Sequence, residues 1–136
     1  MRKFLIAAHG SFASGIKSSL DIIMGETENV FVIDAYVDGN KAIEDELNKI
    51  LAQIRPEDEL VVFSDLMGGS ITNQVIRWAV GKNVHVVAGM NLPLLIDLIM
   101  ADAGLPVADA IENSLHAAKE QIVYVNKLIT KENAHD

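Results

Sequence analysis

Leu60-Val61-Val62-Phe63-Ser64-Asp65-Leu66-Met67-Gly68-Gly69-Ser70 is the stretch that decides the fold, because an apolar run passes directly into a glycine-containing turn. The consecutive apolar side chains predict a strand over residues 59–64 that is buried on both faces. Strands of that kind belong to parallel sheets whose two faces are covered by helices. A helix is expected after the turn, over residues 71–80, with Gly81 at its end. This stretch alone therefore indicates an α/β fold.

The rest of the chain alternates in the same way between short strand patterns and longer helical patterns. Further strands are expected at residues 3–8, 29–37 and 84–88. Further helices are expected at residues 12–23 and 43–54, after Asn91, and at residues 106–120. Alternation of this kind predicts an open, doubly wound, mainly parallel sheet of four strands flanked by helices.

The last part of the chain leaves one element open. Ile122-Val123-Tyr124-Val125 has the composition of a short strand, but it could equally prolong the preceding helix. As a strand it needs a sheet edge to pair with, and the helix over residues 94–100 is apolar almost all round. Both features predict a homodimer, with a fifth, antiparallel strand at the edge of the sheet. Residues 1–130 are expected to form one domain and residues 131–136 a charged, frayed tail.

Composition limits the functions that the chain can perform. The formal net charge of −8 argues against a nucleic-acid partner, because phosphate backbones are held by clustered Lys and Arg. The chain has no cysteine, which excludes disulfides and thiol catalysis and fits a cytoplasmic protein. The apolar run from Phe4 stops at His9, too short for a signal peptide, and no stretch predicts a membrane span. Chemistry is therefore expected from His, carboxylate or hydroxyl side chains.

Unusual segments follow three of the expected strands. His9-Gly10 follows the first strand, residues 65–70 follow the third, and Met90-Asn91 follow the fourth. In an open parallel sheet, ligands bind outside the carboxyl ends of the strands, where the winding reverses. If the first and third strands are neighbours there, His9 and Asp65 face each other. The carboxylate then fixes the imidazole tautomer and leaves the other ring nitrogen free to act as a nucleophile.

The turn after the third strand adds groups that attract anions. Gly68 and Gly69 expose backbone N–H groups, and Ser70 adds a hydroxyl at the start of a helix. Together with His9 and Asp65, these groups describe an acceptor for a phosphoryl group. Taken singly, each has a purely structural interpretation, because a lone histidine is more often an ordinary polar residue and the others can serve a cap or a turn.

The remaining histidines and Asp34 are poorer candidates. His85 is expected at the beginning of its strand, at the opposite edge from the site, and His116 within a helix. His135 belongs to the charged tail. Asp34, near the end of the second strand, can reach the rim of the site but is expected to be a solvated carboxylate.

Three motifs together resemble a known family. They are Ala8-His9-Gly10, Asp65-Leu66-Met67-Gly68-Gly69-Ser70 and Gly89-Met90-Asn91-Leu92-Pro93, each placed after an expected strand. In this order they are similar to the mannose-type enzyme IIA (EIIA) domains of the bacterial sugar phosphotransferase system, and the resemblance covers essentially the whole domain. One departure is the pair Leu66-Met67, since the family often has an aromatic residue in this loop.

The resemblance implies that His9 receives a phosphoryl group from the phosphohistidine of the carrier HPr. It then passes the group to an enzyme IIB component, which serves the membrane components IIC and IID. In the same way the resemblance implies that Asp65 orients the imidazole, that Gly68, Gly69 and Ser70 contact the phosphate, and that the last strand is exchanged between subunits. No cofactor or metal is expected.

Two other functions fit parts of the pattern. The phosphocarrier subunit of a dihydroxyacetone kinase has a similar fold and also uses a histidine after the first strand, but Gly68-Gly69-Ser70 favours the sugar system. A doubly wound domain that binds a flavin or another small ligand needs no nucleophilic histidine. Acceptor assays with the two partner types separate the two carriers, and phosphorylation by HPr of a colourless protein excludes flavin binding as the main role.

Overall fold

The computed structural model describes residues 1–133 and contains a sheet of four parallel strands. The strands are β1 (Arg2–His9), β2 (Val30–Ala35), β3 (Glu59–Ser64) and β4 (Val84–Ala88). Their order across the sheet is β2-β1-β3-β4, and every neighbouring pair is parallel. The α/β class and the four-stranded parallel sheet are therefore confirmed.

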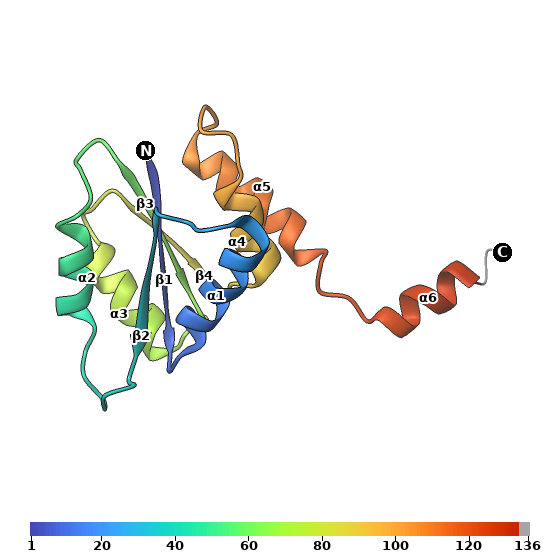
Figure 1. Cartoon of the computed structure of the whole chain (residues 1–136), viewed down its shortest axis with the longest axis horizontal. Coiled ribbons are helices and arrows are strands. Elements are labelled where there is room, and N and C mark those ends of the chain that lie inside the picture. Colours follow the sequence, from blue (N-terminus) through green and yellow to red (C-terminus); the bar gives the residue numbers. More distant parts are fainter. Residues whose placement is uncertain (134–136) are drawn as a thin grey trace.

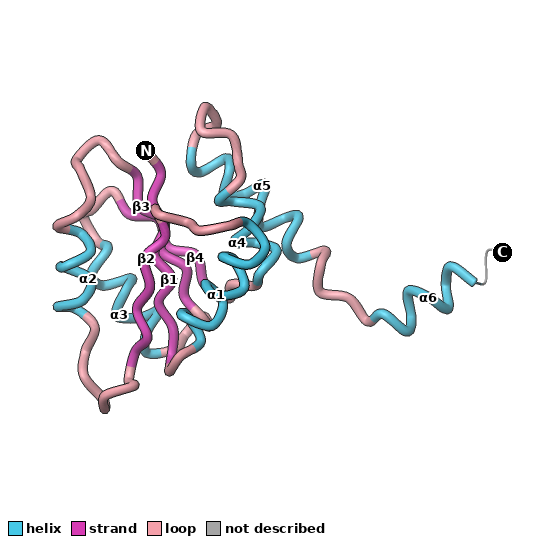
Figure 2. Tube along the Cα trace, viewed as in Figure 1, coloured by secondary structure: helices cyan, strands magenta, loops and turns pink. Residues whose placement is uncertain are grey.

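Helices cover both faces of this sheet (Figures 1 and 2). α2 and α3 lie on one face, and α1, α4 and α5 lie on the other. Their bounds are α1 Phe12–Met24, α2 Glu44–Leu51, α3 Ser70–Ala79, α4 Leu92–Ile99 and α5 Val107–Lys119. A last helix, α6 (Val125–Asn133), projects away from the body of the chain.

Two hydrophobic cores result, one on each side of the sheet. Successive side chains of a strand point to opposite faces, so Phe4 and Ile6 of β1 pack toward α1, α4 and α5. Leu5 and Ala7 pack toward α2 and α3 instead. The apolar run of β1 thus serves both cores, as expected for a strand covered on both sides.

The strand order places the reversal of winding between β1 and β3. The chain passes from β1 outward to β2 and then returns to the other side of β1 to form β3. Ala7 pairs with Ser64 in the register of these two strands, so the next residues of both strands leave the sheet side by side. His9 and Asp65 are delivered to this point, where a doubly wound sheet binds its ligands.

β2 is shorter than the sequence pattern suggests. The expected strand continued to Val37, but β2 ends at Ala35. Tyr36 has a φ of +66°, the left-handed region that a bulky residue seldom adopts, and this turns the chain out of the sheet. A run of apolar and aromatic residues carries no signal for such a reversal, so the pattern overestimated the strand.

The segment after α5 differs from both expectations. Residues 122–124 are neither a strand nor a continuation of α5, because α5 ends at Lys119 and α6 begins at Val125. These residues form an extended link in the described chain (Figure 2). The expected frayed tail lies partly outside the described residues: α6 continues to Asn133, and residues 134–136 are not described.

No helix in the described range, residues 1–133, is both long and apolar enough to cross a membrane. This includes α4, which is the most apolar helix but extends only from Leu92 to Ile99.

The start of α4 offers a first test of the fold. The Asn91 side chain accepts a hydrogen bond of 2.9 Å from the backbone N–H of Leu94. Because Asn91 caps the helix in this way, we expect Asn91→Ala to lower the free energy of unfolding by about 1 kcal/mol. Denaturant unfolding measures the loss, and Asn113→Ala, at an exposed position within α5, is the matched control. Equal stability of the two variants would contradict the cap.

Candidate functional site

His9 and Asp65 meet where β1 and β3 leave the sheet. Nδ1 of the His9 ring lies 2.6 Å from Asp65 Oδ2, and the backbone N–H of His9 donates to the same oxygen at 2.8 Å. One carboxylate oxygen thus holds both the main chain and the ring of His9. Because an ionised carboxylate can only accept, Nδ1 carries the proton, and in the neutral imidazole the lone pair is then on Nε2.

Asp65 is well placed to remain ionised. Partial burial of the carboxyl raises its pKa, but hydrogen bonds from the His9 backbone and ring and from the Leu66 backbone more than offset that effect. The net result is a pKa below the ordinary value, so Asp65 is a carboxylate at neutral pH. The Asp65 side chain is 12% exposed while the His9 side chain is 40% exposed, so the imidazole is the accessible member of the pair.

Ser70 and Tyr36 contact the other side of the His9 ring. Ser70 Oγ lies 3.3 Å from Nε2, and the Tyr36 hydroxyl donates to Ser70 Oγ at 2.9 Å. The rings of His9 and Tyr36 lie 5.5 Å apart, centre to centre, at an angle of 59°. Nε2 therefore faces the first residue of α3, and the N-terminal N–H groups of a helix attract an anion.

The turn between β3 and α3 requires its glycines. Gly68 has a φ of +81°, which residues with a side chain rarely adopt. A Cβ on Gly69 would come within 3.0 Å of the Leu66 side chain. Thr72 holds the turn from beneath, because its hydroxyl donates to the Leu66 carbonyl at 2.7 Å and lies 2.7 Å from the buried Ser64 hydroxyl. The turn thus brings Ser70 to the imidazole.

The surface around the imidazole is hollowed and partly apolar. A groove of about 360 Å³ lies beside Ser70, and Tyr36, Gln74 and Arg77 are among the residues that line it. Phe12, Leu66 and Met67 are large apolar side chains that are exposed on the segments next to His9 and Asp65. A docked protein could cover such side chains.

The other candidates from the sequence lie apart from this site or have a structural role. Asp34 is half-buried and accepts a hydrogen bond of 2.9 Å from the Ser14 backbone N–H, so it joins the end of β2 to the first turn of α1 and has a structural contact that was not expected. His85 lies near the beginning of β4, and His116 is an exposed residue of α5, within 3.6 Å of Glu120. His135 lies outside the described residues.

Sequence reasoning missed Tyr36 and Gln74. Gln74 Nε2 donates to the Tyr36 hydroxyl at 2.9 Å, so both residues belong to the network around Ser70. Tyr36 was not considered as a site residue because the second strand was expected to continue through it. Gln74 had only one available signal, its position one helical turn after Ser70, which places it on the same face of α3.

Comparisons with known proteins agree with this geometry. The EIIA-man family model, described as "PTS system fructose IIA component", matches residues 3–115. The chain is 27% identical over 123 residues to the fructose-specific EIIA component of Bacillus subtilis (strain 168), covering 89% of this chain and 84% of that protein. It is 33% identical over 100 residues to the mannose-specific EIIAB component of Escherichia coli (strain K12); the match covers 71% of this chain and 31% of that longer protein.

A solved structure extends the likeness to the fold. The phosphotransferase system component EIIA from Streptococcus agalactiae superposes with a TM-score of 0.82 at 28% identity, covering 93% of this chain and 99% of that one. The site and the fold define an EIIA-type component of a phosphotransferase system. The chain belongs to the mannose-type EIIA family, as its motifs suggested.

Proposed function

We infer that this chain is a phosphohistidine carrier that accepts a phosphoryl group from phospho-HPr on Nε2 of His9 and passes it to an enzyme IIB component. The observation that carries the proposal is the pairing of Nδ1 with Asp65 at 2.6 Å, because in the neutral imidazole it places the proton on Nδ1 and the lone pair on Nε2. Nε2 faces the start of α3, where backbone N–H groups favour negative charge.

The transfer exchanges one phosphorus–nitrogen bond for another. The Nε2 lone pair attacks phosphorus, the Nε2–P bond forms as the donor's N–P bond breaks, and the electron pair of that bond remains on the donor imidazole. Asp65 keeps the Nδ1–H and balances the positive charge that develops on the ring. Because the two bonds are similar, catalysis consists mainly of positioning and charge stabilisation.

HPr and enzyme IIB are proposed to dock on the surface around His9. Phe12, Leu66 and Met67 supply exposed apolar area beside the imidazole, and such area is typical of the centre of a protein interface. The pair Leu66-Met67, where the family often has an aromatic residue, is therefore expected to affect partner preference. The membrane components IIC and IID follow in the pathway without touching this chain, which acts in the cytoplasm.

The function is tested by reconstitution of the relay. With phosphoenolpyruvate, enzyme I and HPr, the protein should acquire one acid-labile phosphoryl group and then lose it to an added enzyme IIB. A dihydroxyacetone kinase in place of enzyme IIB is the control acceptor. Transfer to the kinase alone would assign the chain to the other phosphocarrier class.

The carrier is also proposed to be a homodimer. β4 lies at the edge of the described sheet, and the extended link after α5 exposes apolar side chains such as Ile122, which is 76% accessible. An edge strand with unpaired backbone groups is a pairing site for another extended segment. The link of one subunit is therefore expected to add a strand to the sheet of the other.

The dimer is measured by light scattering at micromolar concentration. Val123→Pro should shift the protein toward monomer, because proline removes a donor from the added strand. Ile22→Asp, at a position of α1 that is 84% exposed, is the matched control and should remain dimeric. A wild-type protein that is only monomeric would contradict the proposal.

A further inference from the structure

Behind Ser70, a chain of hydrogen bonds leads from the main chain before α2 to the His9 ring. The Ile43 backbone N–H donates to Gln74 Oε1 at 3.0 Å, and Gln74 Nε2 donates to the Tyr36 hydroxyl at 2.9 Å. The Tyr36 hydroxyl donates to Ser70 Oγ at 2.9 Å, and Ser70 Oγ lies 3.3 Å from His9 Nε2. We propose that Tyr36 and Gln74 are positioning residues that aim the Ser70 hydroxyl proton at Nε2.

The donor and acceptor roles along this chain of hydrogen bonds, called the relay below, are fixed by backbone groups that can only donate or only accept. A backbone N–H can only donate, so the Gln74 atom facing Ile43 must be the carbonyl oxygen. The Gln74 nitrogen also donates to the Ser70 carbonyl at 3.3 Å, and a carbonyl can only accept. The two contacts agree on the orientation of the amide, although the two ends of an amide have nearly the same shape.

The orientation of Gln74 determines the roles of the two hydroxyls. Because the Tyr36 oxygen accepts from Gln74, its own proton is available for Ser70. Ser70 Oγ then accepts from Tyr36, and its proton is available for the lone pair on Nε2. Asp65, on the opposite side of the ring, requires the same tautomer, since it accepts a hydrogen bond from Nδ1–H. Two sets of contacts from different elements thus favour one tautomer of His9.

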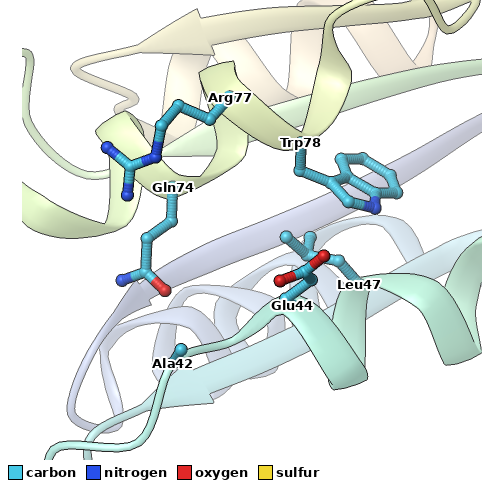
Figure 3. A pocket seen from close by; sticks show the side chains of 6 residues that line it. All are labelled: Ala42, Glu44, Leu47, Gln74, Arg77 and Trp78. Atoms are coloured by element: carbon cyan, nitrogen blue, oxygen red, sulfur yellow. The ribbon is translucent and has the colours of Figure 1, made fainter.

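The backbone supports the same role for Tyr36. It is the one residue other than glycine with a positive φ among the described residues, and such strain persists where surrounding contacts determine the conformation. Figure 3 shows Gln74 extending from α3 toward Ala42, in the segment just before α2. Gln74 is half-buried there, and its hydrogen bonds to Ile43 and Tyr36 are partly buried.

The role of the relay in transfer rests on the proposed phosphorylation of His9. Before transfer, the Ser70 hydroxyl donates to the Nε2 lone pair, which is the lone pair that attacks phosphorus. As the Nε2–P bond forms, the Ser70 hydroxyl releases the lone pair, and after transfer it lies beside the phosphoryl oxygens and can donate to them. A donor that is already aimed at developing negative charge stabilises the transition state without a reorganisation cost.

Tyr36→Phe is the first test, because it removes only the hydroxyl and keeps the ring beside His9. We expect the rate of phosphoryl transfer from phospho-HPr to fall by about three- to tenfold, the range of one lost hydrogen bond. Ser18→Ala is the control, since it also removes one hydroxyl and Ser18 is an exposed residue of α1. It should transfer at the wild-type rate.

Gln74→Glu is a sharper test, since it keeps the shape of the side chain and reverses the relay. The introduced carboxylate can accept from Ile43 but cannot donate to Tyr36, so the Tyr36 proton turns toward that carboxylate and the Ser70 proton turns away from Nε2. The rate should therefore fall. In the Tyr36→Phe background the same change should cost less, because the hydroxyl that it redirects is gone. Equal costs in both backgrounds would show that only the added charge matters and would overturn the relay.

The ¹⁵N chemical shifts of the His9 ring give a readout that needs no partner protein. In the neutral ring of the wild type, the proton should be on Nδ1 and not on Nε2, and Gln74→Glu should increase the fraction of rings with a proton on Nε2. Unchanged shifts and unchanged rates in both variants would overturn the relay while leaving the carrier function intact. Wild-type protein that takes no phosphate but shows these shifts would instead overturn the carrier function alone.

Discussion

His9→Ala should abolish phosphorylation of the chain by phosphoenolpyruvate, enzyme I and HPr. The physical reason is that His9 alone, among the histidines that the structure describes, combines a partly buried carboxylate on one nitrogen with the N-terminus of a helix at the other. Without the imidazole, Asp65 and Ser70 remain at the reversal between β1 and β3, but no ring nitrogen is left there to form phosphohistidine. Incorporation of labelled phosphate, measured under conditions that preserve phosphohistidine, checks the result.

The other histidines provide the controls. His85→Ala, His116→Ala and His135→Ala should each be labelled to the wild-type extent. His9→Ala should retain its fold in circular dichroism, because the His9 side chain is 40% exposed and contributes little to either core. A folded His9→Ala protein that still carries phosphohistidine would remove both the site and the mechanism.

Asp65→Ala is expected to slow transfer on the order of 100-fold or more. The imidazole loses the acceptor of its Nδ1 proton and the charge that balances the developing positive ring, so both tautomers become populated. Single-turnover transfer from phospho-HPr measures the loss. Asp65→Asn separates the two contributions, because its amide oxygen can still accept the Nδ1 proton but carries no charge. We expect its loss to be smaller, about tenfold.

Equal rates for the wild type, Asp65→Ala and Asp65→Asn would assign Asp65 a structural role only. In that case the carboxylate would serve to join β1 to the turn after β3 through the His9 backbone N–H, which donates to it at 2.8 Å. The loss of unfolding free energy would then be the main effect of Asp65→Ala.

Much of the fold was predictable because it depends on patterns that survive in a single sequence. The apolar stretch from Leu60 to Phe63 indicated a strand buried on both faces, and parallel sheets bring the carboxyl ends of such strands together. The pairing of His9 with Asp65 followed from this rule before any distance was known. The adjacency of β1 and β3 was the single condition on which it depended.

The features that were missed depend on backbone geometry and on contacts distant in sequence. The left-handed conformation of Tyr36 is imposed by its surroundings and has no local signal, since neither glycine nor asparagine marks it. The role of Asp34 required knowledge that α1 begins beside the end of β2. The link at residues 122–124 has strand composition but no strand partner within residues 1–133, and composition alone cannot supply the partner.

One Asp65 oxygen binds both the backbone N–H and the ring of His9, and this affects the direction in which phosphoryl groups flow in the proposed function. Because this oxygen binds both the backbone N–H and Nδ1, we expect the imidazole of the proposed carrier to stay in one position, so that its phosphorylated and unphosphorylated forms have almost the same shape. In the proposed function, HPr and enzyme IIB must then compete for one surface. The net transfer of phosphoryl groups between HPr and enzyme IIB then follows their relative degrees of phosphorylation. It reverses when enzyme IIB is the more highly phosphorylated of the two.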